Sequence, residues 1–200
     1  MIHVLTRFSR HENYEQMKAI LNFDSVQWHL ILDGPPPLPL ADWIDAATFH
    51  RNPESDPHCY GLTNRWIETR RIEDNDWFHF LNDDDAVEPG FYDKLQRLDV
   101  PERVVVCRML RGNRIPHGVV PLRAYPTTPL EPRPENMRVG EVGDEQFILR
   151  GDILRQLRFQ PEHHAADGMA AQWLVRNFPI HYAPELNVLF NYLEPGRWNQ

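Results

Sequence analysis

The most distinctive segment of the sequence is Trp77-Phe78-His79-Phe80-Leu81-Asn82-Asp83-Asp84-Asp85. Its first five residues are apolar apart from one histidine, and such a run predicts a buried strand. Three carboxylates follow directly, at the point where this strand ends. Ligands of open α/β sheets bind at the carboxyl ends of the strands. The stretch therefore indicates a sheet with an acidic site at one edge.

The three adjacent aspartates, Asp83, Asp84 and Asp85, repel one another unless a cation or water separates their charges. A hard divalent ion such as Mg²⁺ or Mn²⁺ takes carboxylate oxygens and leaves positions open for phosphate. No lysine or arginine occurs between residues 73 and 88 to neutralise them. Two interpretations stay open at this point: a metal site, and a solvated acidic turn in front of the next helix.

Outward from this stretch, predicted strands and helices alternate along the chain. Strands are expected at residues 2–5, 26–32, 48–50, 77–81, 104–107, 147–149 and 188–192. Helices are expected at residues 11–22, 42–47, 61–71, 91–98, 151–157 and 165–177. This order predicts an α/β fold in a single domain over residues 1–200, with a mainly parallel central sheet flanked by helices.

Composition excludes several classes of protein. The 200 residues include 21 Lys and Arg against 29 Asp and Glu, and the resulting net charge of -8 argues against a nucleic-acid partner. Two cysteines, Cys59 and Cys107, exclude a disulfide framework and a thiolate zinc site and fit a reducing cytosol. No run reaches the roughly 18 apolar residues of a membrane span, and no signal peptide is visible. We therefore expect a cytoplasmic protein.

Three further motifs surround the acidic stretch. They are Gly61-x-x-Asn64-x-x-Ile67, Pro89-Gly90-Phe91 and the later Gly143-Asp144-Glu145-Gln146-Phe147-Ile148-Leu149-Arg150. In this order the motifs resemble the core of GT-A glycosyltransferases, and are most similar to family 2 of the inverting enzymes. The resemblance runs from about residue 2 to about residue 176. It implies a GT-A, Rossmann-like fold with a nucleotide-binding part at about 1–100 and an acceptor-side part at about 101–200.

The resemblance also implies roles for single residues. Asp84 matches the metal-binding aspartate of the family, and Asn82 takes the first position of its DxD-type motif. Asp83 with Asp85 is an alternative register that stays open. The metal, Mn²⁺ or Mg²⁺, would bind the diphosphate of the donor and stabilise the leaving group. The residues expected to bind the nucleotide-sugar are Thr6, Arg7, Asp33, Asn64, Asn82 and Asp83.

Inverting transfer needs a general base beside the acceptor hydroxyl. By resemblance this catalytic base is Asp167, at the start of a late helix, although Ala166 stands where the family usually has glutamate. Asp167 also suits the N-cap of that helix, and the two roles are compatible. His181 matches a late histidine that some GT-A enzymes use as a further metal ligand.

Two other groups of residues have simpler interpretations. His163-His164 matches no standard zinc spacing and indicates a pair of surface histidines. Between residues 104 and 130 four arginines occur without an acid, and we favour ion pairs with acids elsewhere over a site for an anionic acceptor. These arginines are Arg108, Arg111, Arg114 and Arg123.

The resemblance implies a metal-dependent inverting glycosyltransferase of polysaccharide biosynthesis. Its donor would be a UDP-, GDP- or dTDP-linked sugar, and its acceptor a hydroxyl of a saccharide or glycoconjugate. The departures at Asn82 and Ala166 keep open a catalytically inactive, GT-A-like nucleotide-sugar or carbohydrate-binding module. A metal phosphoesterase is a weaker third hypothesis, because the His and Asp residues of the chain lack the spacing of recognised phosphoesterase metal ligands. The chain is short for this fold, which is compatible with a protein partner or a homo-oligomer.

Overall fold

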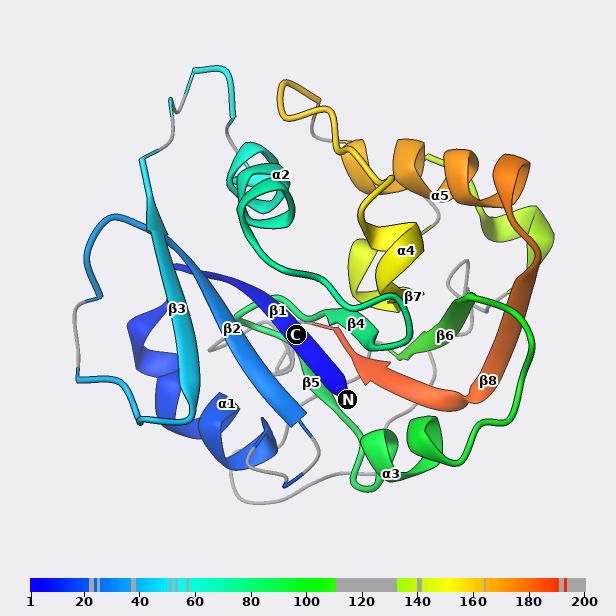
Figure 1. Ribbon diagram of the computed structural model, residues 1–200, viewed down its shortest axis with the longest axis horizontal. Coiled ribbons are helices and arrows are strands. Elements are labelled where there is room, and N and C mark those ends of the chain that lie inside the picture. Colours follow the sequence, from blue (N-terminus) through cyan, green and yellow to red (C-terminus); the bar gives the residue numbers. More distant parts are fainter. Residues whose placement is uncertain are drawn as a thin grey trace, which may run out of the picture.

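The computed structural model describes residues 1–21, 24, 26–36, 39–50, 52, 54–56, 58–110, 133–139, 142–163, 165–190 and 193. Within these ranges the strands form one curled sheet in the order β3-β2-β1-β4-β7-β6-β8-β5. Helices α2, α4 and α5 cover one face of this sheet, and α1 and α3 cover the other (Figure 1).

The elements have the following bounds. The strands are β1 (Ile2–Phe8), β2 (Val26–Asp33), β3 (Ile44–Phe49), β4 (Trp77–Phe80), β5 (Ala86–Val87), β6 (Val104–Leu110), β7 (Phe147–Arg150) and β8 (Ile180–Leu189). The α-helices are α1 (Tyr14–Leu21), α2 (Tyr60–Thr69), α3 (Phe91–Gln96), α4 (Gly151–Leu154) and α5 (Ala166–Asn177). Short 3-10 helices lie at η1 (His11–Asn13), η2 (Pro134–Asn136) and η3 (Asp144–Gln146).

Strand direction divides the sheet into two halves. Strands β3, β2, β1 and β4 are all parallel. Strand β7 runs against both β4 and β6, β8 is parallel to β6, and β5 runs against β8. The start of β7 therefore lies at the same edge as the ends of β1, β2 and β4. Four of the seven strand pairs in the described chain are parallel, and the expected α/β class is confirmed.

An apolar core lies on each face of the sheet because successive strand residues point to opposite faces. In β1, Val4 packs in the cluster under α1 and α3, and Leu5 packs in the cluster under α2, α4 and α5. Trp28 is fully buried in the first cluster, and Trp66 in the second. These two cores hold the strand ends in fixed positions.

Two predicted elements need correction. The helix expected at residues 42–47 is wrong: Ile44–Phe49 form β3, whose backbone pairs with β2 from Trp28–Ile44 onward. A helix this short is unstable by itself, whereas pairing with β2 satisfies the backbone groups on one side of the segment. The last strand begins at Ile180 rather than at residue 188, because β8 continues through Pro184 with a shift of register against β6. The two-residue strand β5 was not predicted.

Within the described ranges, none of the helices combines the length and the apolar character that crossing a bilayer demands.

Candidate functional site

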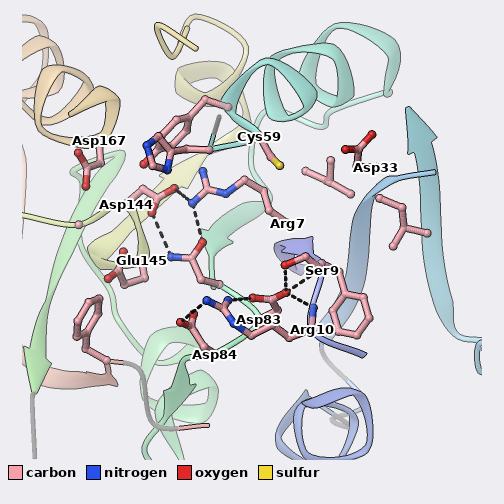
Figure 2. A pocket seen from close by; sticks show the side chains of 18 of the residues that line it. Arg7, Ser9, Arg10, Asp33, Cys59, Asp83, Asp84, Asp144, Glu145 and Asp167 are labelled. Atoms are coloured by element: carbon pink, nitrogen blue, oxygen red, sulfur yellow. Dashed lines mark hydrogen bonds and ion pairs between the residues drawn. The ribbon is translucent and has the colours of Figure 1, made fainter. Parts of the chain in front are cut away.

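A cavity of about 920 Å³ opens at the edge of the sheet where β1, β2 and β4 end and β7 begins (Figure 2). Four segments line most of it, and α2 and α5 add residues from their first turns. The segments are residues 7–11, 31–35, 82–84 and 142–145. The acidic stretch that ends β4 therefore lies in a cavity built from several strand ends, as open α/β sheets place their ligands.

Asp83 anchors the loop that follows β1. Its Oδ2 accepts hydrogen bonds from the Ser9 amide at 2.5 Å, the Ser9 hydroxyl at 2.9 Å and the Arg10 amide at 2.7 Å. The Arg10 guanidinium binds the other carboxylate oxygen through Nη1. The Asp83 carbonyl accepts a further bond from Asn13. Protein donors therefore occupy both carboxylate oxygens of Asp83.

The other two aspartates of the stretch have different surroundings. Asp84 lines the cavity, its side chain is 10% exposed, and its Oδ2 lies 3.2 Å from Nη2 of Arg10. Asp85 is fully buried and does not belong to the residues that line the cavity. Of the two expected registers, Asn82 with Asp84 therefore lies wholly in the cavity lining, whereas Asp83 with Asp85 does not.

Arg7 places a largely buried positive charge in the site. Its Nη2 lies 2.7 Å from Asp144 Oδ2 and donates a 2.6 Å hydrogen bond to the Asn82 side-chain oxygen. The guanidinium carbon stacks 4.3 Å above the Tyr60 ring. Burial opposes the charge, but Asp144, Tyr60 and Glu145 together outweigh this effect, so the pKa of Arg7 is raised. Arg7 therefore stays protonated and ties the end of β1 to the start of β7.

Glu145, the neighbour of Asp144 in η3, is a buried residue of the cavity lining. Burial, and then the charges of Asp85 and Asp144, raise the pKa of Glu145 well above its usual range. A Cβ at Gly143 would lie 2.5 Å from Glu145 Oε2, so any other residue there would displace this carboxyl group.

His79 supports the same segment from β4. Its Nε2 lies 2.9 Å from the Glu145 carbonyl and donates to it, while the Tyr92 hydroxyl donates to Nδ1 over 3.1 Å. This arrangement suits one neutral tautomer. Burial lowers the pKa of His79 to about 4, so the ring stays neutral and holds η3 in place.

Asp167 faces the cavity from the first turn of α5 (Figure 2). Burial, and then the nearby charge of Asp144, raise the pKa of Asp167 to about 6. The N-cap of α5 is Ala165, so the expected N-cap role of Asp167 is wrong by two residues. Its Oδ1 nonetheless accepts a 2.6 Å bond from the Gly168 amide, one of the first-turn donors.

The structure brings some of the predicted residues together. Those that line the cavity are Arg7, Asp33, Asn82, Asp83, Asp84 and Asp167. Asp33 ends β2 with an exposed side chain, and Asn82 is half-buried between Arg7 and Asp144.

Besides Asp85, three predicted residues do not line the cavity. Thr6 is fully buried, and its hydroxyl accepts a 3.0 Å bond from Trp28 Nε1. The Asn64 side chain donates to the Phe159 carbonyl at 2.8 Å and accepts from the Phe159 amide at 3.0 Å. His181 pairs with Val105 near the start of β8. Because β8 ends at the cavity, His181 lies at the opposite edge of the sheet, which corrects its expected place beside the acidic stretch.

Other expectations concern residues of the second half. His163 is exposed, as expected of a surface histidine, and His164 lies outside the described residues. Arg108 is in β6, and the other three arginines of its group lie outside the described residues.

Sequence reasoning assigned no individual role to four residues that shape the site, namely Ser9, Arg10, Asp144 and Glu145, although the last two lie in one of the motifs that carry the resemblance. Ser9 and Arg10 follow the first strand directly, so a search for side chains at strand ends would have found them. Asp144 and Glu145 precede a strand. They reach this edge only because β7 is antiparallel, which its sequence does not indicate.

A divalent cation fits part of this donor set. Among the residues that the structure describes, no three His, Cys, Asp or Glu side chains are grouped as a metal site. Mg²⁺, however, is often held by one or two carboxylates together with substrate phosphates. Asp84 is suited to such a role by its place on the cavity wall, whereas the oxygens of Asp83 are already engaged.

No protein-family model matches the sequence, and no curated protein matches it. Its structure is similar to that of S. aureus TarS 1–349, with a TM-score of 0.58, 13% identity, and 95% of this chain and 58% of that chain covered. TarS 1–349 in complex with UDP-GlcNAc gives a TM-score of 0.60, 11% identity and coverage of 94% and 58%.

The complex of TarS 1–349 with UDP gives a TM-score of 0.57, 14% identity and coverage of 94% and 60%. The chain thus spans about three fifths of the length of these solved structures. At this identity the likeness shows the fold alone, and it confirms the expected GT-A-like α/β fold.

Proposed function

We propose that the chain is an inverting glycosyltransferase that transfers a sugar from a nucleotide-diphospho-sugar to an acceptor hydroxyl. The observation that carries the proposal is a single cavity with Asp84 on one side and Asp167, whose pKa is raised to about 6, on another. The complex of the similar TarS with UDP-GlcNAc, a nucleotide-diphospho-sugar, supports this class of donor.

Asp167 would act as the general base. Its carboxylate takes the proton of the acceptor hydroxyl while the hydroxyl oxygen attacks the anomeric carbon of the donor sugar. The bond from that carbon to the diphosphate oxygen breaks, and the diphosphate leaves with the electron pair. A pKa of about 6 keeps most of Asp167 ionised at pH 7 and makes it a stronger base than an ordinary aspartate.

Asp84 would hold Mn²⁺ or Mg²⁺ together with oxygens of the diphosphate. A divalent cation bound there supplies positive charge where the leaving group becomes negative. Asp33, exposed at the end of β2, would contact the nucleoside. The resemblance of the motifs to family 2 supports saccharides or glycoconjugates as acceptors.

The first test is a thermal-shift series with UDP, GDP, dTDP and their sugars, each with and without Mn²⁺. A ligand that binds only the folded state raises the melting temperature, so we expect a Mn²⁺-dependent rise with one nucleotide. Asp84→Ala should lose this rise, because the proposed cation ligand is gone, and Asp167→Asn should keep it. No response to any nucleotide would overturn the proposed donor site.

A nucleotide-sugar-binding module without activity is the second candidate. It is favoured by the Asn82 side chain, which accepts a hydrogen bond from Arg7, and by the fully buried Ala166 where the family has an acid. Sugar transfer or donor hydrolysis at saturating donor separates the two. Turnover that Asp167→Asn abolishes supports the enzyme, and binding without turnover supports the module.

A further inference from the structure

Arg10 is the residue of the site whose role neither the motifs nor the proposed reaction explains. It lies in the loop after β1, and its guanidinium bridges two carboxylates (Figure 2). Nη1 binds Asp83, and Nη2 lies 3.2 Å from Asp84 Oδ2. The side chains of Asp83 and Asp84 are only 3% and 10% exposed, whereas that of Arg10 is 38% exposed.

The two ends of this bridge are held differently. On the Asp83 side, the Arg10 amide and the Ser9 amide and hydroxyl bind the same carboxylate as the guanidinium does. On the Asp84 side, Nη2 lies 3.2 Å from Oδ2, farther than any of the donors that bind Asp83. The contact between Arg10 and Asp84 is therefore weaker than the contact with Asp83, and breaking it costs less free energy.

A divalent cation at Asp84 conflicts with the observed position of Nη2. The cation and the guanidinium would share one carboxylate, and two positive charges within a few ångströms repel strongly in a partly buried site. A guanidinium carries five N–H donors in a planar fork, so it can keep Nη1 on Asp83 while its other edge turns to a phosphate.

We propose that Arg10 is a counter-ion switch: it neutralises Asp84 when the site is empty and turns to the donor diphosphate when a cation takes Asp84. This inference rests on the proposed function, because it needs a cation and a diphosphate at Asp84. The switch makes the binding of cation and diphosphate cooperative. The cation alone must displace Arg10, and the diphosphate receives the displaced guanidinium.

The test uses the full chain and two probes, Mn²⁺ alone and inorganic pyrophosphate with saturating Mn²⁺. Binding of Mn²⁺ is followed by the loss of the electron paramagnetic resonance signal of the free ion, and binding of pyrophosphate by calorimetry. Arg10→Ala keeps the backbone amide that binds Asp83, so the loop retains most of its anchors. Arg71→Ala is the matched control, since Arg71 is 90% exposed and outside the cavity.

We expect Arg10→Ala to bind Mn²⁺ alone about fivefold more tightly than the unaltered chain, because a competing ion pair is removed. The same variant should bind pyrophosphate at least about tenfold more weakly, because a charge-assisted hydrogen bond is lost. Arg71→Ala should change neither affinity, and Asp84→Asn should abolish Mn²⁺ binding. A purely structural role of Arg10 would not change the two affinities in opposite directions.

Two results overturn the switch, and they differ in what they mean for the proposed function. If Mn²⁺ binds the unaltered chain and Arg10→Ala equally, Arg10 does not compete for Asp84, and the cation site stands without a switch. If Mn²⁺ binds no variant at millimolar concentration, the cation assignment of Asp84 fails and the switch fails with it.

Discussion

At the scale of single residues, Asp167 is the group whose environment most affects the proposed reaction. It is half-buried near the negative charge of Asp144, and both the partial burial and this charge keep a proton on its carboxyl group to a higher pH. A general base acts only when deprotonated. We therefore expect the transfer rate to rise with pH through about 6 and to level off above pH 7.

The pH dependence of kcat/KM with a saturating acceptor measures this titration. Asp144→Asn removes the neighbouring charge and should move the midpoint down toward the ordinary aspartate range. Asp93→Asn, at an exposed position of α3, should leave the midpoint in place. A rate that does not change between pH 5 and pH 8 would exclude Asp167 as the base.

Part of the candidate site could be predicted from the sequence. The motif order pointed to Asp33 at the end of β2, to Asp84 in the loop after β4, and to Asp167, and all three line one cavity. The sequence could not choose between Asp83 and Asp84, because adjacent aspartates share the same chemistry. The choice depends on the loop after β1, whose amides take up Asp83.

At the scale of elements, Asn64 shows how a helix of the scaffold is held. Its side chain makes two hydrogen bonds with the backbone of Phe159, and so ties α2 to the segment between α4 and α5. Asn64→Ala leaves this amide and carbonyl without their partners, which should lower the free energy of unfolding by about 2 kcal/mol. Urea denaturation measures the loss.

Glu68→Ala, at an exposed position of the same helix, serves as the control and should cost less than about 0.5 kcal/mol. The nucleotide-dependent thermal shift of Asn64→Ala should remain, because this side chain does not line the cavity. A variant with normal stability and lost nucleotide binding would instead place Asn64 in the donor site.

Most elements could be predicted because their apolar residues recur with the period of a strand or a helix. Residues 44–49 could not, since β3 forms through pairing with β2, which local periodicity does not report. Pro184 hid the first half of β8, because a register shift accommodates it inside the strand. The direction of a strand likewise depends on the strands with which it pairs. The antiparallel direction of β7 was therefore not predicted.

At the scale of the whole molecule, His79 links stability to pH. Its pKa is about 4 in the folded protein and about 6.5 in the unfolded chain, so the unfolded chain binds the extra proton first. The contribution of neutral His79 to the free energy of unfolding is therefore complete above pH 6.5 and is lost as the pH falls from 6.5 to 4. The loss should reach about 3 kcal/mol, at about 1.4 kcal/mol for each pH unit.

Urea denaturation at pH 7, 5.5 and 4.5 measures this slope. His79→Gln has no proton to gain in this range, and it should show a shallower dependence on pH together with a lower stability at pH 7. His50→Gln, at an exposed position, should keep the slope of the unaltered chain. Equal slopes in all three proteins would show that His79 is protonated as easily in the folded state as in the unfolded chain.

The order of the strands in the sheet also determines when each strand can pair during synthesis of the chain. Strands β1 to β4 lie together and are complete once residue 80 has left the ribosome. Strand β5 must wait about a hundred residues for its partner β8, and the β4 edge stays open until β7 arrives. An open strand edge invites wrong pairing during synthesis. Asp84 precedes the interval between β4 and β7 in the chain, and Asp167 follows it, so the cavity cannot form until both parts of the chain have been made.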